Sequence, residues 1–177
     1  MLMKIRHYVQ KDDLKSIYYA IFSSHMIYGS QIWGQSINTH TEKIFKLQNR
    51  ALRIIESADF KEDASPLYKN NNILKLENHI ELQNCLFVHD FLNNNLPKCF
   101  KDYFIKINEI HSIRTTSSKL GCLYTPYLST TRYGLNSITK KCIDIWNFFT
   151  KYFKQDLSTL NRNSFKHKIY KYYIDGY

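Results

Sequence analysis

The segment from residue 43 to residue 53 carries cations at the spacing of a single helical face. Lys43, Lys46, Arg50 and Arg53 recur at i, i+3, i+7 and i+10, and they form one continuous basic stripe if the segment is helical. Cations held along a rigid helix can bind a polyanion, and an arginine can contact a phosphate through two parallel hydrogen bonds. The spacing therefore predicts a phosphate-binding surface that includes Arg50 and Arg53.

Apolar residues follow the same period one position further along this segment. The apolar stripe comprises Ile44, Leu47, Ala51 and Ile54. Such a stripe is typical of the face that a helix packs against a core. A helix is therefore expected from about residue 39 to about residue 57, with its apolar face inward and its basic face outward. Arg53 also lies within i+3 reach of Glu56, so a solvated ion pair is an alternative to phosphate contact at that position.

Further candidate nucleic-acid contacts lie nearer the C-terminus: Arg114, Arg132, Tyr133, Lys140 and Lys141. The two arginines belong to polar, turn-rich segments, where side chains often face a ligand. Tyr133, with Tyr124 and Tyr127 nearby, has an aromatic ring on which a base can stack. For the two lysines, the competing interpretation is a simple solvated surface.

The two tryptophans are weaker candidates for stacking on bases. Trp33 follows Ile32, and Trp146 lies beside Ile145 with Phe149 one turn further on. These apolar neighbours favour a role for both tryptophans as core anchors.

The composition indicates an anionic partner, with one competing explanation. The net charge is +10 and the pI is about 9.4, which favours contact with nucleic acid. The chain is also rich in Lys, Asn, Ile, Tyr and Phe and has only 5 Gly and 3 Pro, as a base composition biased toward A and T would encode. Part of the lysine excess can arise from that bias, so the arginines carry more weight.

The same composition limits the class of protein. A hydrophobic fraction of 44% with 23% charged residues is typical of a globular chain. Polar residues interrupt every apolar run before it reaches the roughly 20 residues of a membrane span. The first residues lack the apolar core of a signal peptide. We therefore expect an intracellular protein, nuclear or cytoplasmic, with no membrane partner.

The residue patterns of common catalytic sites are missing. The adjacent acidic pairs, Asp12-Asp13 and Glu62-Asp63, have the contexts of a helix start and a polar loop. Two-metal catalysis needs carboxylates that converge on ions about 4 Å apart, and the sequence suggests no third partner for either pair. It contains no phosphate-binding glycine loop, and its four cysteines lack the short paired spacing of metal ligands. We expect no catalytic residues, no metal, no cofactor and no enzymatic activity of the chain on its own, with four reduced and mostly buried thiols.

The hydrophobic periodicity predicts a mainly α fold, a multi-helix, bundle-like domain with one irregular or weakly β segment at about 110–133. Helices are expected over 12–28 and 39–57, in a short stretch after Ser65-Pro66, from 76 to about 92, from Ser137 onward and over 164–174. Residues 1–11 are expected to be a lead-in. Residues 12–109 form an N-terminal helical part, and residues 110–177 combine the irregular segment with C-terminal helices in one overall domain.

Several segments, taken in order, resemble a known family. They include Leu14-Lys-Ser-Ile-Tyr-Tyr-Ala-Ile, Tyr28-Gly-Ser-Gln-Ile-Trp-Gly, Leu47-Gln-Asn-Arg-Ala-Leu-Arg-Ile-Ile, Asn93-Asn-Asn-Leu-Pro-Lys-Cys-Phe and Arg132-Tyr-Gly-Leu-Asn-Ser-Ile. Their order and spacing are similar to the region that follows the fingers and palm in non-LTR (LINE-type) retrotransposon reverse transcriptases, especially the jockey-like group. The resemblance extends over about residues 12 to 174.

The resemblance implies a C-terminal piece of a polyprotein whose endonuclease and RNA-directed DNA polymerase lie upstream. The catalytic aspartates of the palm would precede residue 1, so the resemblance carries no polymerase activity to this chain. It implies thumb-proximal and post-thumb helices that grip template RNA and target DNA, with Arg50 and Arg53 in the family's Gln-x-Arg-x-x-Arg pattern. The alternative is a helical protein-interaction module whose basic charge is compositional.

Overall fold

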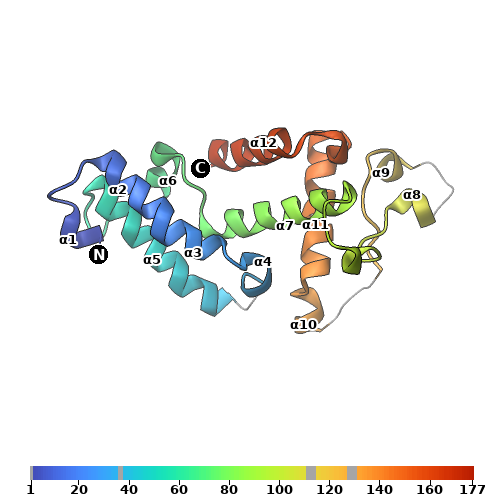
Figure 1. Cartoon of the computed structure of the whole chain (residues 1–177), viewed down its shortest axis with the longest axis horizontal. Helices are drawn as coiled ribbons and strands as arrows, with labels where there is room; N and C mark the ends of the chain where they lie inside the picture. Colours follow the sequence, from blue (N-terminus) through green and yellow to red (C-terminus); the bar gives the residue numbers. More distant parts are fainter. Residues whose placement is uncertain (1, 36–37, 111–114, 127–130) are drawn as a thin grey trace. The chain divides into compact units, whose positions relative to one another are not determined.

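A computed structural model describes residues 2–35, 38–110, 115–126 and 131–177 (Figure 1). The regular elements of this part of the chain are helices, and its β structure is one isolated antiparallel bridge between Lys106 and Leu123. The prediction of a mainly α, bundle-like fold is therefore confirmed. The chain divides into two compact units, Met1–Ile80 with Lys171–Tyr177 (unit 1) and Glu81–Tyr170 (unit 2).

Unit 1 begins with short helical elements. After α1 (Leu2–Ile5), α2 (Lys11–Ile17) continues through the π-helical turn η1 (Tyr18–Ser23) into α3 (Ser24–Ile27). The helix predicted for residues 12–28 is thus present, with a π-helical turn in its middle. The expected lead-in contains α1, whose Leu2 and Ile5 pack against the unit 1 core.

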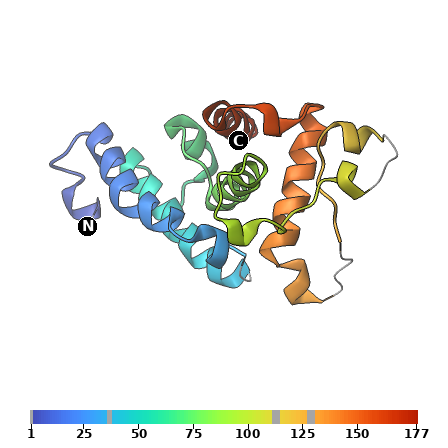
Figure 2. The same ribbon diagram turned by 45° about the vertical axis from the view of Figure 1, so that its right-hand side comes forward.

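Gly29 separates α3 from α4 (Ser30–Trp33). Its φ is +63°, a left-handed conformation that glycine adopts without a Cβ clash. The long helix α5 (Asn38–Glu56) follows and lies alongside α2 and α3 in two views (Figures 1 and 2). The helix predicted for about residues 39–57 is confirmed.

The buried face of α5 differs from the predicted apolar stripe. It consists of Gln48, Ala51, Leu52 and Ile55, each at most 5% exposed, whereas Leu47 is 55% exposed. The inward face is therefore turned by about one position relative to the prediction. The physical reason is Gln48, a polar residue that sequence periodicity assigns to the surface but whose side-chain amide makes three hydrogen bonds within the core.

α6 (Ser65–Asn71) and α7 (Leu76–Leu92) follow α5. The short helix predicted after Ser65-Pro66 is α6; its N-cap residue is Ala64, and Pro66 lies in its first turn. Asn72 ends α6 in the left-handed conformation, with φ +55°. The C-terminal tyrosine closes this part of unit 1, because the Tyr177 hydroxyl accepts hydrogen bonds from the backbone N–H of Lys75 and from Asn78 Nδ2, both at 2.8 Å.

Unit 2 is built around α11 and α12. Its elements after α7 are η2 (Lys98–Phe100), α8 (Ile107–Ile110), α9 (Thr116–Lys119), α10 (Arg132–Leu135), α11 (Ile138–Phe153), η3 (Leu157–Thr159) and α12 (Arg162–Asp175). α7 and α12 each contain residues of both units. Trp146 of α11 is fully buried against Phe165 of α12, with ring centroids 5.6 Å apart.

Two residues of the segment expected to be irregular or weakly β, Cys122 and Tyr124, pair through their backbone with Ile107 and Ile105, which precede it. The same segment also contains α9 and the start of α10. The N–H of Ile107 donates to the Cys122 carbonyl at 3.0 Å, and the N–H of Tyr124 donates to the Ile105 carbonyl at 2.8 Å. The side chain of Asn147 in α11 holds this segment from the other side, because its amide accepts the Leu123 N–H at 2.7 Å and donates to the Leu123 carbonyl at 2.9 Å. The pairing is local and does not extend into a sheet among the described residues.

Candidate nucleic-acid interface

The outward face of α5 presents three of its four predicted cations to solvent. Lys43 and Arg50 are exposed. Lys46 is also exposed, but its Nζ lies 2.7 Å from the Glu42 carboxylate one turn earlier. That hydrogen bond lowers the pKa of Glu42. The charge of Lys46 is therefore partly balanced within the helix, and Lys43 and Arg50 are the exposed cations best placed for an external anion.

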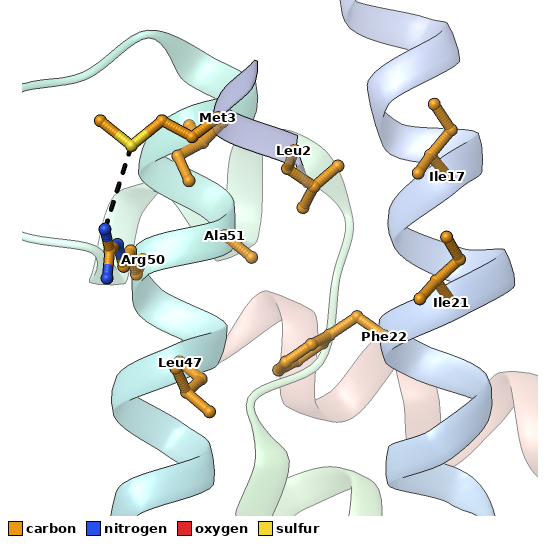
Figure 3. Close-up of a pocket in the computed structure, with 9 residues that line it drawn as sticks. Leu2, Met3, Ile17, Ile21, Phe22, Leu47, Arg50 and Ala51 are labelled. Atoms are coloured by element: carbon orange, nitrogen blue, oxygen red, sulfur yellow. Dashed lines mark hydrogen bonds between the residues drawn. The ribbon is translucent and has the colours of Figure 1, made fainter. Parts of the chain in front are cut away.

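Arg50 is held only weakly by the contact that its guanidinium makes. Its Nη2 lies 3.9 Å from the Met3 sulfur of α1 (Figure 3). A thioether is a weak hydrogen-bond acceptor. A phosphate or carboxylate oxygen would be a much stronger partner, so this contact presents little barrier to ligand binding.

Arg53 has a structural contact of its own. Its Nε donates to the backbone carbonyl of Glu62 at 2.8 Å, which ties the loop after α5 to the helix. The possible Arg53–Glu56 pair is replaced by another arrangement: Glu56 accepts from Lys11 Nζ at 2.7 Å and from the Asn71 side-chain amide. Arg53 is therefore half-buried with its Nε engaged in a hydrogen bond, whereas Arg50 is exposed.

The polar residues just before Arg50 have core functions. Gln48 Nε2 donates to the Tyr18 hydroxyl at 3.0 Å and to the Leu74 carbonyl at 2.9 Å, and its Oε1 accepts the Leu76 N–H at 2.9 Å. Asn49 Oδ1 accepts from the Tyr68 hydroxyl at 2.6 Å. The first residues of the Gln-Asn-Arg motif thus fix the position of α5, and the fixed helix presents Arg50.

The candidates in unit 2 have less accessible charge. Lys140 Nζ lies 2.9 Å from the Asp144 carboxylate, and Lys141 is half-buried in the first turn of α11. Ser137 caps this turn by accepting the Lys140 N–H at 3.3 Å, as the predicted helix start at Ser137 requires. Arg114 and Tyr127 lie outside the described residues, as do the side chains of Arg132 and Tyr133.

The two tryptophans have structural roles, as predicted. Trp146 is fully buried, and its Nε1 donates to the Gly121 carbonyl at 3.2 Å. Trp33 is half-buried beside the cluster of Met26, Leu76 and Ile80, and its Nε1 donates to the Tyr28 carbonyl at 2.9 Å. Trp146 is therefore not exposed to bases, and packing and a hydrogen bond hold Trp33.

A second group of basic side chains lies on α12 and is not among the sequence candidates. Lys166 and His167 are exposed, and Lys168 Nζ lies over the Phe153 ring, 4.4 Å from its centroid. Residues 160–174 contain four Lys and Arg and no Asp or Glu. This local charge imbalance is the signal in the sequence that would have identified α12 as basic.

Neither a metal-binding cluster nor a membrane-spanning helix is found in the described part of the chain. No group of three or more His, Cys, Asp or Glu side chains could hold a metal ion there. None of the described helices is long and apolar enough to cross a membrane. Of the four free cysteines, Cys99 is exposed and the other three are buried.

A comparison of the chain with models of protein families, with curated proteins and with solved structures found no match in any of the three.

Proposed function

We propose that this chain binds nucleic acid through the basic face of α5, as the thumb-proximal and post-thumb region of a non-LTR retrotransposon reverse transcriptase. In this proposal the chain binds template RNA or target DNA for an upstream polymerase domain and has no catalytic activity alone. The observation that carries the proposal is the exposure of Lys43 and Arg50 on one face of a 19-residue helix.

The spacing of these two cations suits a nucleic-acid strand. Arg50 lies seven positions after Lys43, which corresponds to about 10 Å along a helix axis. Phosphates of one DNA strand advance about 3.4 Å per nucleotide along the duplex axis. The two side chains can therefore contact phosphates about three nucleotides apart on one strand, and contacts to phosphates carry no base preference.

The rigid support of α5 favours binding at low entropic cost. Gln48 bonds α5 to Tyr18 of η1 and to the connection before α7, and Arg53 bonds the loop that follows the helix. A surface that is already ordered loses little conformational freedom when it binds. The proposal therefore assigns Gln48 and Arg53 to support and Arg50 to phosphate contact.

The proposal is tested by fluorescence anisotropy with labelled single-stranded RNA and duplex DNA over a range of salt concentrations. We expect binding of at least one of them, little dependence on base sequence, and an affinity that falls linearly with salt on logarithmic axes. If neither is bound at low salt, the proposal is wrong.

A second candidate function is a helical protein-interaction module. The exposed apolar side chains Ile21 and Leu47, beside Arg50, favour it. Arg50→Ala separates the two candidates, with Lys101→Ala, at an exposed lysine of unit 2, as the control for loss of one charge. If the α5 face binds nucleic acid, Arg50→Ala weakens binding more than Lys101→Ala does; if the basic charge is only compositional, the two variants lose the same small amount.

A further inference from the structure

An apolar groove lies in unit 1, between the α2–η1 segment and α5 (Figure 3). Its volume is about 380 Å³, within the range of small-molecule binding sites. Ile17, Ile21 and Phe22 form one wall, and Leu47, Ala51 and Ile54 form the other. At one end, Leu2 of α1 lies between the two walls, and Met3 lies over α5 with its sulfur toward Arg50 (Figure 3).

The groove exposes apolar surface to solvent. Met3, Ile21 and Leu47 are 54%, 45% and 55% exposed, respectively. Grouped apolar side chains that remain in contact with water favour binding of an apolar ligand. Ile21 and Phe22 belong to the π-helical turn η1, and π-helical turns are frequent at functional sites. The exposure and the π turn are two separate indications that the groove is a binding site.

Arg50 adds one positive charge to the lining of the groove. Of the nine described residues that line it, eight are apolar and the ninth is Arg50. No carboxylate is among these nine residues, and the contact of the guanidinium with the Met3 sulfur is a weak one. The site therefore combines an apolar surface with one cation that can bind a carboxylate through two hydrogen bonds.

We propose that this groove binds a free single-chain carboxylate, with its hydrocarbon chain between Ile21 and Leu47 and its carboxylate on the Arg50 guanidinium. Leu2 and Met3 at one end make a long amphipathic helix a poorer fit, because a helix would need a groove open at both ends. A nucleic-acid phosphate would reach Arg50 but would leave the apolar walls exposed. This ligand goes beyond the proposed nucleic-acid function.

Chain length is the first test. Isothermal titration calorimetry with hexanoate, octanoate and decanoate is carried out below the micelle concentration of each. We expect one site per chain and an affinity that rises by about two- to fourfold per methylene, then stops rising when the hydrocarbon fills the groove. Binding that is not saturable, or that does not depend on chain length, would overturn the proposal.

Charge is the second test, with a matched control on the same helix. Arg50→Gln is expected to weaken decanoate binding about tenfold or more, because it removes the charge-assisted hydrogen bonds, and to leave the affinity for the neutral decanol within about twofold. Lys46→Gln also removes one positive charge from α5, but at a side chain paired with Glu42, and it is expected to change decanoate binding by less than about twofold. Equal losses in the two variants would contradict an Arg50-specific site.

The apolar wall is tested independently of nucleic-acid binding. Leu47→Ser is expected to weaken decanoate binding about tenfold while binding of duplex DNA is retained. Lys43→Gln is expected to weaken binding of duplex DNA while decanoate binding is retained. Met3→Ser, at another exposed side chain, serves as a second variant if Leu47→Ser does not fold. If the chain forms a dimer that Leu47→Ser dissociates, a second copy covers the groove and the carboxylate proposal is wrong. If the unmodified chain binds decanoate but binds neither duplex DNA nor single-stranded RNA, only the proposed function is contradicted.

Discussion

At the scale of single residues, Gln48 connects three parts of unit 1 through one buried amide. Its bonds to the Leu74 carbonyl and the Leu76 N–H satisfy backbone groups in the connection between α6 and α7, and its third bond reaches Tyr18. A buried backbone group that loses its partner costs about 1–3 kcal/mol. Sequence periodicity could not identify this role, because a glutamine beside apolar residues has the pattern of a surface position.

We predict that Gln48→Leu lowers the free energy of unfolding by about 2–5 kcal/mol, because it leaves the Leu74 carbonyl and the Leu76 N–H without their partner. Urea unfolding followed by circular dichroism measures the change. Gln10→Leu is the control: Gln10 is exposed and its side chain makes no capping bond to α2, so a change within about 0.5 kcal/mol is expected. Equal stabilities of the two variants would show that the buried amide is dispensable.

Arg50 and Arg53 make a second residue-scale comparison, because the sequence assigns both to phosphate contact. Arg53→Gln is predicted to cost about 1 kcal/mol of unfolding free energy, since it loses the bond to the Glu62 carbonyl. Arg50→Gln is predicted to change stability by less than about 0.5 kcal/mol, since its contact is to a thioether. Thermal unfolding of both variants distinguishes these roles, and a larger loss for Arg50→Gln would reverse the assignment. The Arg53 bond was not predictable, because its acceptor is a backbone oxygen nine residues away in a loop.

At the scale of elements, hydrophobic periodicity predicted the helices more reliably than their faces. The long helices α5, α7 and α11 lie where the apolar spacing places them. The apolar Leu47 and Ile54, however, line the groove, while Gln48 is buried. A period of 3.6 residues shows that a helix has an apolar side. The directions of adjacent side chains around the helix axis differ by about 100°, so an apolar residue that lines a groove next to the core is easily assigned to the core itself.

The close approach of α4 to the start of α7 gives an element-scale prediction. A Cβ at Gly34 would lie 2.8 Å from Ile80 Cγ2 and would also contact the Ser30 carbonyl. Gly34→Ala is therefore predicted to lower the free energy of unfolding by about 1–3 kcal/mol through overpacking, measured by urea unfolding. At Gly176 the nearest atoms to a new Cβ are at 3.5 Å, an ordinary contact, so Gly176→Ala serves as the control with no comparable loss. An unchanged stability of Gly34→Ala would contradict the tight approach.

At the scale of the whole molecule, hydrophobic periodicity predicted the mainly α class, but no feature of the sequence predicts the division into two compact units. Their boundaries fall inside α7 and α12, where no linker-like composition interrupts the helical pattern. Burial also gives both units ionisable groups that favour the neutral form. It raises the pKa of Tyr18 in unit 1 to about 12 and that of Cys142 in unit 2 to about 12.

The titration of these groups predicts a loss of stability in alkali. The pKa of Tyr18 is higher in the folded chain than in the unfolded chain, where it is about 10. The contribution of Tyr18 to the free energy of unfolding is complete below pH 10. This contribution is lost as the pH rises toward 12, because the hydroxyl loses its proton at a lower pH in the unfolded state than in the folded state. The slope is about 1.4 kcal/mol per pH unit for one such group. Urea unfolding between pH 8 and pH 12 is predicted to show this fall in the free energy of unfolding. The fall is expected to be shallower for Tyr18→Phe and to equal that of the unmodified chain for Tyr28→Phe, which replaces an exposed ring.

The salt dependence of duplex DNA binding tests most directly whether the α5 face binds phosphates. For the unmodified chain and for Arg50→Gln, the logarithm of the association constant is plotted against the logarithm of the salt concentration. If Arg50 contacts a phosphate, the magnitude of the slope falls by about 0.9 in the variant, while Lys46→Gln, whose charge is paired with Glu42, changes the slope much less. An identical slope for the unmodified chain and Arg50→Gln would contradict phosphate binding by the α5 face.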